Sequence, residues 1–319
     1  LYDLTNTFFE GSGKYNSKAH FGNSKEKRGD CPLVTLALAV DAEGFPKRTE
    51  VFPGNISEPG TLEEIISCLS PKTRPLIVID AGIATEENIA WLKGRYDYIV
   101  VSRKKKIDVL PDMITVREDN RRCIRAGIIL TDDEATLICH STDKEIKQTG
   151  INNRYEITVE KNNNLATSVT WVKKQKEHHP GMYALRSNRT DLAEQEFFNI
   201  FSMLTDIEDA FRSMKSELGL RPVYHQKEHR TDGHLFITVI AYHIMHTIRY
   251  ALKNKQINDS WSTIRKALST HVRITTTMKK DDGRVIHIRK STRPEPVHTR
   301  IYDALNLSCR PGKTIKTIL

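Results

Sequence analysis

The sequence predicts an α/β fold in which a mixed sheet is flanked by helices and interrupted by a β-rich insertion. Three observations predict it. In residues 1–102, nearly continuous apolar runs, typical of buried strands, alternate with helical patterns. Short alternating segments with polar turns between them fill residues 103–189. A long helix with a single apolar stripe then begins near Asp191.

Residues 1–102 make up the first part of the predicted core. A strand containing Asp3 opens the chain, and a turn signal at 41–44 predicts a hairpin. A capping box of Thr61 and Glu64 predicts a short helix, because the two side chains satisfy free N–H groups at a helix start. The other elements are strands at 33–40, 47–52, 75–80 and 98–101 and a helix at 85–93. This order is that of a ribonuclease-H-like sheet.

Residues 103–189 form the predicted β-rich insertion. Its entrance is the charge run Arg103-Lys104-Lys105-Lys106, which suits a phosphate contact and a solvated linker equally well. The expected strands lie at 114–117, 124–130, 135–140, 155–159, 169–172 and 182–186.

Residues 190–255 are the second part of the predicted core, and residues 256–319 are a basic tail of helix and hairpin. The long helix begins near Asp191, with Glu194 at the capping spacing, and ends at Gly219. The other elements expected here are helices at 233–252 and 260–268 and a hairpin at 272–289 that turns at 281–283.

Charge is distributed unevenly along the chain. The net charge of the whole chain is +9, yet residues 221–319 contain 19 Lys and Arg against 7 Asp and Glu. A strongly basic C-terminal part favours a polyanionic partner, nucleic acid first, although a solvated basic surface gives the same composition.

Composition also limits the compartment and the class of protein. With 38% hydrophobic and 28% charged residues, the chain suits a globular protein rather than a disordered one. No apolar run approaches the roughly 18 to 20 residues of a membrane-spanning helix, so we expect no membrane partner. The five cysteines form no C-x-x-C pair, which favours a reducing cytoplasm. Because the chain begins with Leu1 inside a strand-like pattern, we expect further sequence upstream.

Two aspartates lie at strand positions where an acidic residue is unusual. Asp80 ends a buried strand, at the sheet edge where ligands gather in open α/β folds, although a helix-entry turn uses the same residue. Asp3 lies within the first strand, where the alternative is a frayed strand end.

Glu208 borders the apolar stripe of the long helix, followed at i+4 and i+7 by Arg212 and Lys215. Such a carboxylate suits a metal ligand with phosphate-binding cations beside it. A surface ladder of salt bridges has the same pattern.

Three stretches resemble insertion-sequence transposases of the IS-four type, which belong to the DDE class and have a ribonuclease-H-like core. The stretches are Tyr2-Asp3-Leu4-Thr5-Asn6-Thr7, Ile77-Val78-Ile79-Asp80-Ala81-Gly82, and 207–215 continuing into Arg221-Pro222-Val223-Tyr224-His225 and Asp232-Gly233-His234. The likeness covers most of residues 1–250. In the family's signature Tyr-x2-Arg-x3-Glu-x6-Lys, Glu208 and Lys215 match, whereas Phe201 and Leu204 stand at the Tyr and Arg positions.

The resemblance implies an enzyme that cuts and rejoins DNA. Asp3, Asp80 and Glu208 would be the catalytic, metal-binding acids, holding two Mg²⁺ ions, with Mn²⁺ as a substitute. A β-rich insertion before the Glu-bearing helix suits the 127 residues between Asp80 and Glu208. Hard divalent ions prefer carboxylate oxygens, and two such ions stabilise both oxygens of an in-line phosphoryl displacement.

The same resemblance implies the partners. Lys215, Arg212, Arg221 and His225 would contact double-stranded DNA, both the inverted-repeat ends of the element and its target. We expect a homodimer on DNA and a cytoplasmic, nucleoid-associated location in a prokaryote. Two alternatives stay open: a catalytically inactive DNA-binding relic, and a structure-specific nuclease with the same core. Histidines at 225, 229, 234, 243 and 246 fit no zinc-site template, which favours DNA or surface roles.

Overall fold

The structure is a computed structural model that describes residues 1–69, 74–103, 107, 109–119, 122–149, 155–162, 165–173, 179–310 and 314–318. The chain divides into two compact units, Leu1–Val239 and Ile240–Leu319.

The N-terminal sheet has three antiparallel strands, β1 (Tyr2–Phe8), β2 (Leu33–Val40) and β3 (Pro46–Pro53), in that order. Every residue of the central strand β2 is buried, as its continuous apolar run predicts. Asp3 of β1 pairs with Leu38 of β2, so the predicted strand and hairpin are both confirmed. On its other side β1 runs beside β4 (Leu76–Ile79).

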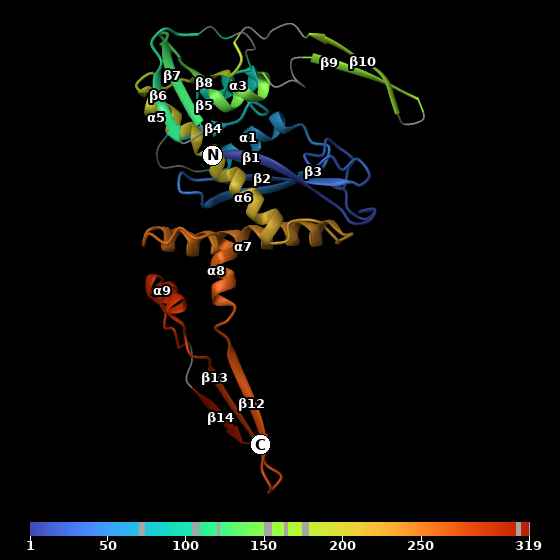
Figure 1. The fold of residues 1–319 in the computed structure, drawn as a ribbon, viewed down its shortest axis with the longest axis vertical. Helices are drawn as coiled ribbons and strands as arrows, with labels where there is room; N and C mark the ends of the chain where they lie inside the picture. The colour runs from blue at the N-terminus through green and yellow to red at the C-terminus, as the bar shows by residue number, and fades with distance from the viewer. Residues whose placement is uncertain are drawn as a thin grey trace. The chain divides into compact units, whose positions relative to one another are not determined.

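A second sheet joins the first part of the core to the predicted insertion (Figure 1). Strand β4 pairs in parallel with β5 (Asp97–Val101), and the remaining neighbours pair antiparallel. The order is β4-β5-β11 (Met182–Ser187)-β8 (Ala135–Ser141)-β7 (Arg122–Leu130)-β6 (Ile114–Asp119). The result is the expected α/β fold with a mixed sheet.

All six short segments of the predicted insertion are strands. Four of them extend the sheet of β4 and β5, whereas β9 (Tyr155–Asn162) and β10 (Leu165–Lys173) form a separate hairpin. Helix α3 (Thr142–Thr149) was not predicted, because it has no buried residue and therefore no apolar stripe. The division of the chain at residues 102, 189 and 255 stays a prediction.

Two apolar clusters cover opposite sides of β4 and β5. Ile77 and Ile79 pack with β1, α1 (Leu62–Ser67) and α2 (Glu86–Lys93). Val78 packs with β7, β8, β11 and α5 (Glu194–Ser202). Successive residues of β4 thus face different clusters. Because both faces of the strand are buried, the residues before Asp80 form a continuous apolar run.

The capping box predicted at Thr61 is wrong. A short 3₁₀ helix, Glu58–Thr61, precedes α1, so Thr61 already has helical backbone angles and its side chain caps nothing. Its hydroxyl instead donates to the carbonyl of Glu58 over 2.6 Å. The next helix, α2, does have a side-chain cap, from Thr85.

The long helix after the insertion is two helices, α5 and α6 (Leu204–Glu217), separated at Met203. The Thr205 hydroxyl donates to the Ser202 carbonyl, and the N–H of Met203 bonds three residues back to Ile200, so the backbone tightens at this point. The predicted cap at Asp191 is wrong as well: Asp191 pairs with Arg189, and Ala193 precedes the first helical residue. Gly219, at φ +71°, follows the end of α6, as predicted.

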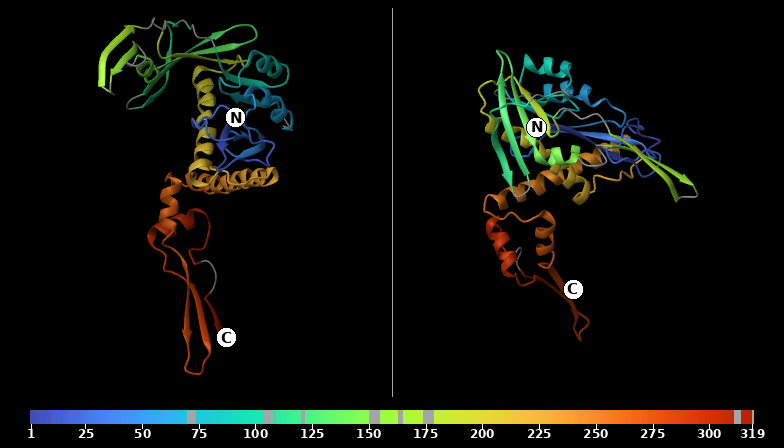
Figure 2. Two further views of the ribbon diagram at one scale, coloured as in Figure 1. Left: turned by 90° about the vertical axis from the view of Figure 1, so that its right-hand side faces the viewer. Right: turned by 45° about the horizontal axis from the view of Figure 1, so that its top comes forward.

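Figures 1 and 2 show α6 alongside the β1–β3 sheet, and α6 packs against β1.

The next helix, α7 (Glu228–Lys253), has 26 residues and contains the boundary between the two units. Among the described residues it is the one helix long and apolar enough to cross a membrane by length and composition. This is weak evidence for a membrane span, because core helices of soluble proteins pass the same test.

The C-terminal unit contains α8 (Trp261–Leu268) and α9 (Pro296–Ala304), which pack around Ile264 and Ile301. Strands β12 (Arg273–Lys279) and β13 (Val285–Ser291) form the predicted hairpin, whose turn includes Gly283 at φ +85°. Helix α9 and strand β14 (Ile315–Ile318), which pairs with β13, were not predicted.

Candidate active site

Asp3 is a mostly buried carboxylate on β1, with its side chain 17% exposed. One oxygen, Oδ1, accepts a hydrogen bond from the N–H of Leu4 over 2.7 Å. Burial raises the pKa of Asp3 to about 6, while the nearby Lys25 ammonium acts in the opposite direction and the charges of Asp80 and Glu58 raise it further. The charges of Asp80 and Glu58 thus both favour the protonated form of Asp3.

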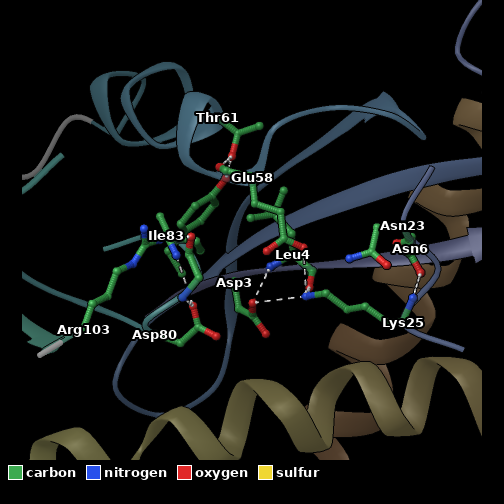
Figure 3. A network of polar contacts seen from close by, with 12 residues as sticks. Asp3, Leu4, Asn6, Asn23, Lys25, Glu58, Thr61, Asp80, Ile83 and Arg103 are labelled. Carbon is green, nitrogen blue, oxygen red and sulfur yellow. Dashed lines mark hydrogen bonds and ion pairs between the residues drawn. The ribbon is translucent and has the colours of Figure 1, made fainter. Parts of the chain in front are cut away.

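Asp80 follows β4 directly and is exposed. Its Oδ1 accepts hydrogen bonds from the N–H groups of Gly82, at 2.8 Å, and Ile83, at 3.3 Å. Because β4 runs beside β1, the two aspartates from distant parts of the sequence lie in one region and point toward the same side (Figure 3). The side chains of Asp3 and Asp80 therefore lie near enough for the charge of Asp80 to raise the pKa of Asp3.

Glu58 is a third carboxylate in this region and was missed by sequence reasoning. A Cβ added to Gly82 would lie 3.1 Å from Oδ1 of Asp80 and 3.3 Å from Oε2 of Glu58, so these two side chains flank the same glycine. Glu58 is the first residue of the short 3₁₀ helix Glu58–Thr61, and no hydrophobic periodicity marks such a residue.

A buried pair of hydroxyls positions the turn that carries Glu58. The hydroxyl of Tyr2, on β1, lies 2.6 Å from the hydroxyl of Thr61, which in turn donates to the Glu58 carbonyl. Tyr2 and Thr61 are each only 1% exposed. The strand that carries Asp3 therefore also fixes the backbone of the turn that carries Glu58.

Lys25 connects the carboxylates from the loop between β1 and β2 (Figure 3). Its ammonium donates to the Leu4 carbonyl over 2.6 Å and lies 3.2 Å from Oε1 of Glu58 and 3.9 Å from Oδ1 of Asp3. A lysine in a polar loop carries no sequence signal that would predict this position.

Arg103 braces the backbone that follows Asp80. Its guanidinium donates to the carbonyls of Ala81 and Gly82, each over 2.7 Å. The charge run at the insertion's entrance thus has a structural role at Arg103, and Lys104, Lys105 and Lys106 lie outside the described residues.

Glu208 is exposed on α6, next to buried Ile207, and makes no hydrogen bond or ion pair with any residue that the structure describes. Its helix packs against β1, the strand of Asp3. In the described part of the chain, no group of three or more His, Cys, Asp or Glu side chains is arranged to hold a metal ion. The structure thus brings Asp3 and Asp80 together but does not bring Glu208 into a metal cluster with them.

The four predicted DNA contacts differ in exposure. Arg212 is 72% exposed and pairs with Asp209 at 2.5 Å. Lys215 and Arg221 both pair with Glu26, and the Lys215 side chain is only 14% exposed. His225 packs edge-on against His234, with ring centroids 5.6 Å apart.

A family model described as "Transposase DDE domain" matches residues 6–244. The match covers Asp80 and Glu208 and begins three residues after Asp3. No curated protein matches this chain.

Proposed function

The chain belongs to the transposase DDE-domain family, and from this premise we propose that it cuts and rejoins DNA at the inverted-repeat ends of an insertion sequence of the IS-four type. The family is one of catalytic nucleases that act in DNA transposition and generally use divalent metal ions. Membership therefore makes the chain an enzyme that binds DNA.

The observation that carries the proposal is the meeting of Asp3 and Asp80 across β1 and β4. Two strands far apart in sequence bring these carboxylates close enough for the charge of one to raise the pKa of the other. The packing of α6 against β1 supports Glu208 as the third acid, since α6 covers the side toward which both aspartates point (Figure 3).

The donor set fits a hard divalent cation. Carboxylate oxygens are the ligands that Mg²⁺ prefers, and the site already attracts a cation, because the Lys25 ammonium lies among the oxygens of Asp3, Glu58 and Leu4. We propose Asp3, Asp80 and Glu208 as the ligands of two Mg²⁺ ions, for which Mn²⁺ substitutes. When bound, such a pair would stabilise charge on the attacking and leaving oxygens of the phosphodiester.

The protein's own contribution is to hold the carboxylates in place. Two backbone N–H groups fix Oδ1 of Asp80, and Arg103 fixes the carbonyls of the same turn. The Leu4 N–H fixes Oδ1 of Asp3. Oδ2 of Asp3 and Oδ2 of Asp80 would therefore be the oxygens left for a metal ion.

For DNA, we propose contacts by Lys215, Arg212, Arg221 and His225. Arg212 and Lys215 belong to α6, the helix of Glu208, and Arg221 and His225 belong to the loop that follows it. Pairing of two element ends requires two subunits, so we propose a homodimer on DNA, in the nucleoid of a prokaryotic cytoplasm.

A cleavage assay tests the proposal. The protein is incubated with Mg²⁺ and a DNA fragment that carries the terminal inverted repeat from its own genomic neighbourhood. Joined products support a transposase, cleavage without joining supports a structure-specific nuclease, and binding alone supports an inactive relic. Asp80→Asn should abolish cleavage and leave DNA binding nearly unchanged. Cutting by this variant at the wild-type rate would refute the assigned site.

A further inference from the structure

Lys25 and Glu26 are consecutive residues in the loop between β1 and β2, and each contacts side chains of the opposite charge. Lys25 places a positive charge among acids, and Glu26 places a negative charge among bases. All of these residues belong to the N-terminal unit.

The Lys25 side of the segment resembles a bound cation. The ammonium has three oxygen neighbours, the carbonyl of Leu4 at 2.6 Å, Oε1 of Glu58 at 3.2 Å and Oδ1 of Asp3 at 3.9 Å. Asp3 is 17% exposed, so part of its access to solvent is already closed. A lysine here lowers the free-energy cost of keeping two carboxylates close together.

The Glu26 side resembles a bound phosphate. Its carboxylate lies 2.9 Å from the Lys215 ammonium and also contacts the Arg221 guanidinium. Burial works against the charge of Glu26, but hydrogen bonds from Arg221 and Lys215 outweigh it and hold its pKa below the usual value. Since Glu26 is 16% and Lys215 14% exposed, a DNA phosphate reaches the Lys215 ammonium only after Glu26 has moved aside.

The backbone of the segment is held by a few polar contacts rather than by an apolar core. The side chain of Asn6, on β1, donates to the Asn23 carbonyl over 2.8 Å and accepts from the Lys25 N–H over 3.2 Å. The Ser24 hydroxyl accepts from the Glu26 N–H over 3.2 Å. Because these contacts are few, ligands that replace the ion pairs of Lys25 and Glu26 can displace the segment.

We propose that Lys25 and Glu26 form a charge clasp that occupies both halves of the site in the absence of ligands. Lys25 neutralises Asp3 and Glu58, and Glu26 neutralises Lys215 and Arg221. Divalent metal replaces the first contact and DNA phosphate replaces the second. This inference rests on the proposed function, because it takes Asp3 as a metal ligand and Lys215 and Arg221 as DNA contacts.

The DNA half is tested with Glu26→Gln and a fluorescein-labelled duplex of random sequence, without metal. Non-specific binding is dominated by phosphate contacts, so releasing one or two cations should tighten binding about tenfold and steepen the slope of log affinity against log salt by about 1 to 2. Glu63→Gln, which removes one exposed negative charge from α1, is the matched control and should change affinity much less. Weaker or unchanged binding by Glu26→Gln overturns the clasp.

The metal half is tested independently, by titrating Mg²⁺ into the DNA-free protein in a calorimeter. Lys25→Gln should bind Mg²⁺ about tenfold more tightly than the wild type, because a competing cation has been removed. Lys27→Gln, an exposed lysine in the same loop, is the control for net charge. Equal Mg²⁺ affinity in the wild type and Lys25→Gln overturns the metal half of the clasp. This measurement does not depend on whether Glu26→Gln folds.

One further pair of variants separates failure of the clasp from failure of the proposed function. Lys215→Ala and Arg221→Ala should each weaken binding of the same duplex. If they do and Glu26→Gln does not strengthen it, Glu26 only positions the two cations and the clasp is wrong. If neither alanine variant affects binding, the DNA contacts under the proposed function are wrong, and the clasp falls with them.

Discussion

The backbone N–H of Gly82 donates to Oδ1 of Asp80, and the glycine has no side chain that would crowd this carboxylate. A Cβ at position 82 would lie 3.1 Å from Oδ1 of Asp80 and 3.3 Å from Oε2 of Glu58, closer than most such contacts in proteins. Both carboxylates would have to move by a few tenths of an ångström.

Gly82→Ala is therefore expected to slow DNA cleavage about tenfold, because small misplacements of catalytic groups are costly. Single-turnover cleavage at saturating Mg²⁺ measures it. Gly94→Ala is the control, since nothing lies within 4 Å of a Cβ at that position. Equal rates for both variants would show that Gly82 does not matter for the geometry of Asp80.

Arg103→Ala removes both hydrogen bonds to the carbonyls of Ala81 and Gly82. Asp80 should then sample more positions, with about tenfold slower cleavage and little change in the melting temperature. Arg103→Lys should restore only part of the rate, because an ammonium does not reproduce the planar fork that bridges two carbonyls. Full activity in Arg103→Lys would mean that charge alone is what Arg103 contributes.

The raised pKa of Asp3 predicts that folding stability depends on pH. Its folded pKa of about 6 is raised above the ordinary 3.8, so between about pH 4 and pH 6 the folded state keeps a proton that the unfolded chain has lost. Stability from this group is therefore highest below about pH 4 and falls by about 2 to 3 kcal/mol as pH rises through 6. Asp3→Asn, which cannot ionise, should be more stable than the wild type near pH 7 and nearly equal to it near pH 4. Urea unfolding at both pH values decides the matter, and a pH-independent difference would contradict the raised pKa.

Glu208→Gln is expected to reduce cleavage by at least a hundredfold while DNA affinity stays within about threefold, as for loss of a metal ligand. The neighbouring acid Asp209 pairs with Arg212 at 2.5 Å and gives the matched control, Asp209→Asn, which should cut at nearly the wild-type rate. Loss of activity in Asp209→Asn with normal cutting by Glu208→Gln would reassign the third acid.

Tyr2→Phe should destabilise the protein by about 1 to 2 kcal/mol, because it leaves the buried hydroxyl of Thr61 with one hydrogen bond fewer. Tyr15→Phe, at a site that is 70% exposed, should change stability by less than about 0.5 kcal/mol. Thermal unfolding of both variants measures the difference. A neutral Tyr2→Phe would show that the turn carrying Glu58 does not depend on this contact.

Sequence patterns predicted the strands well where burial is continuous or alternating. Strand β2 is buried along its whole length, and Val78 and Ile79 face different clusters, so apolar runs were reliable signals. The same periodicity missed the break at Met203, because Phe201 and Leu204 pack against the same cluster on both sides of the interruption. The spacing of apolar residues indicates which face of a helix is buried. It does not reveal a local change in backbone hydrogen bonding.

The candidate site was only partly predictable. Asp3 and Asp80 were found because an acid at a buried strand is unusual. Lys25, Glu26 and Glu58 were missed, since their positions depend on how loops return to β1 through single contacts such as those of Asn6. Loop residues of this kind have no period, and their partners are separated by tens to hundreds of residues.

Strand β11 lies between β5 and β8, with Leu185 paired to Val101 on one side and to Leu137 on the other. Excision or transplantation of the segment from 103 to 189 would therefore leave β5 with an uncovered row of amide and carbonyl groups, a template for self-association. Among the residues that the structure describes, the β9–β10 hairpin shares no ladder with that sheet. Protein engineers who want to shorten or exchange this segment should cut within the hairpin and keep β11.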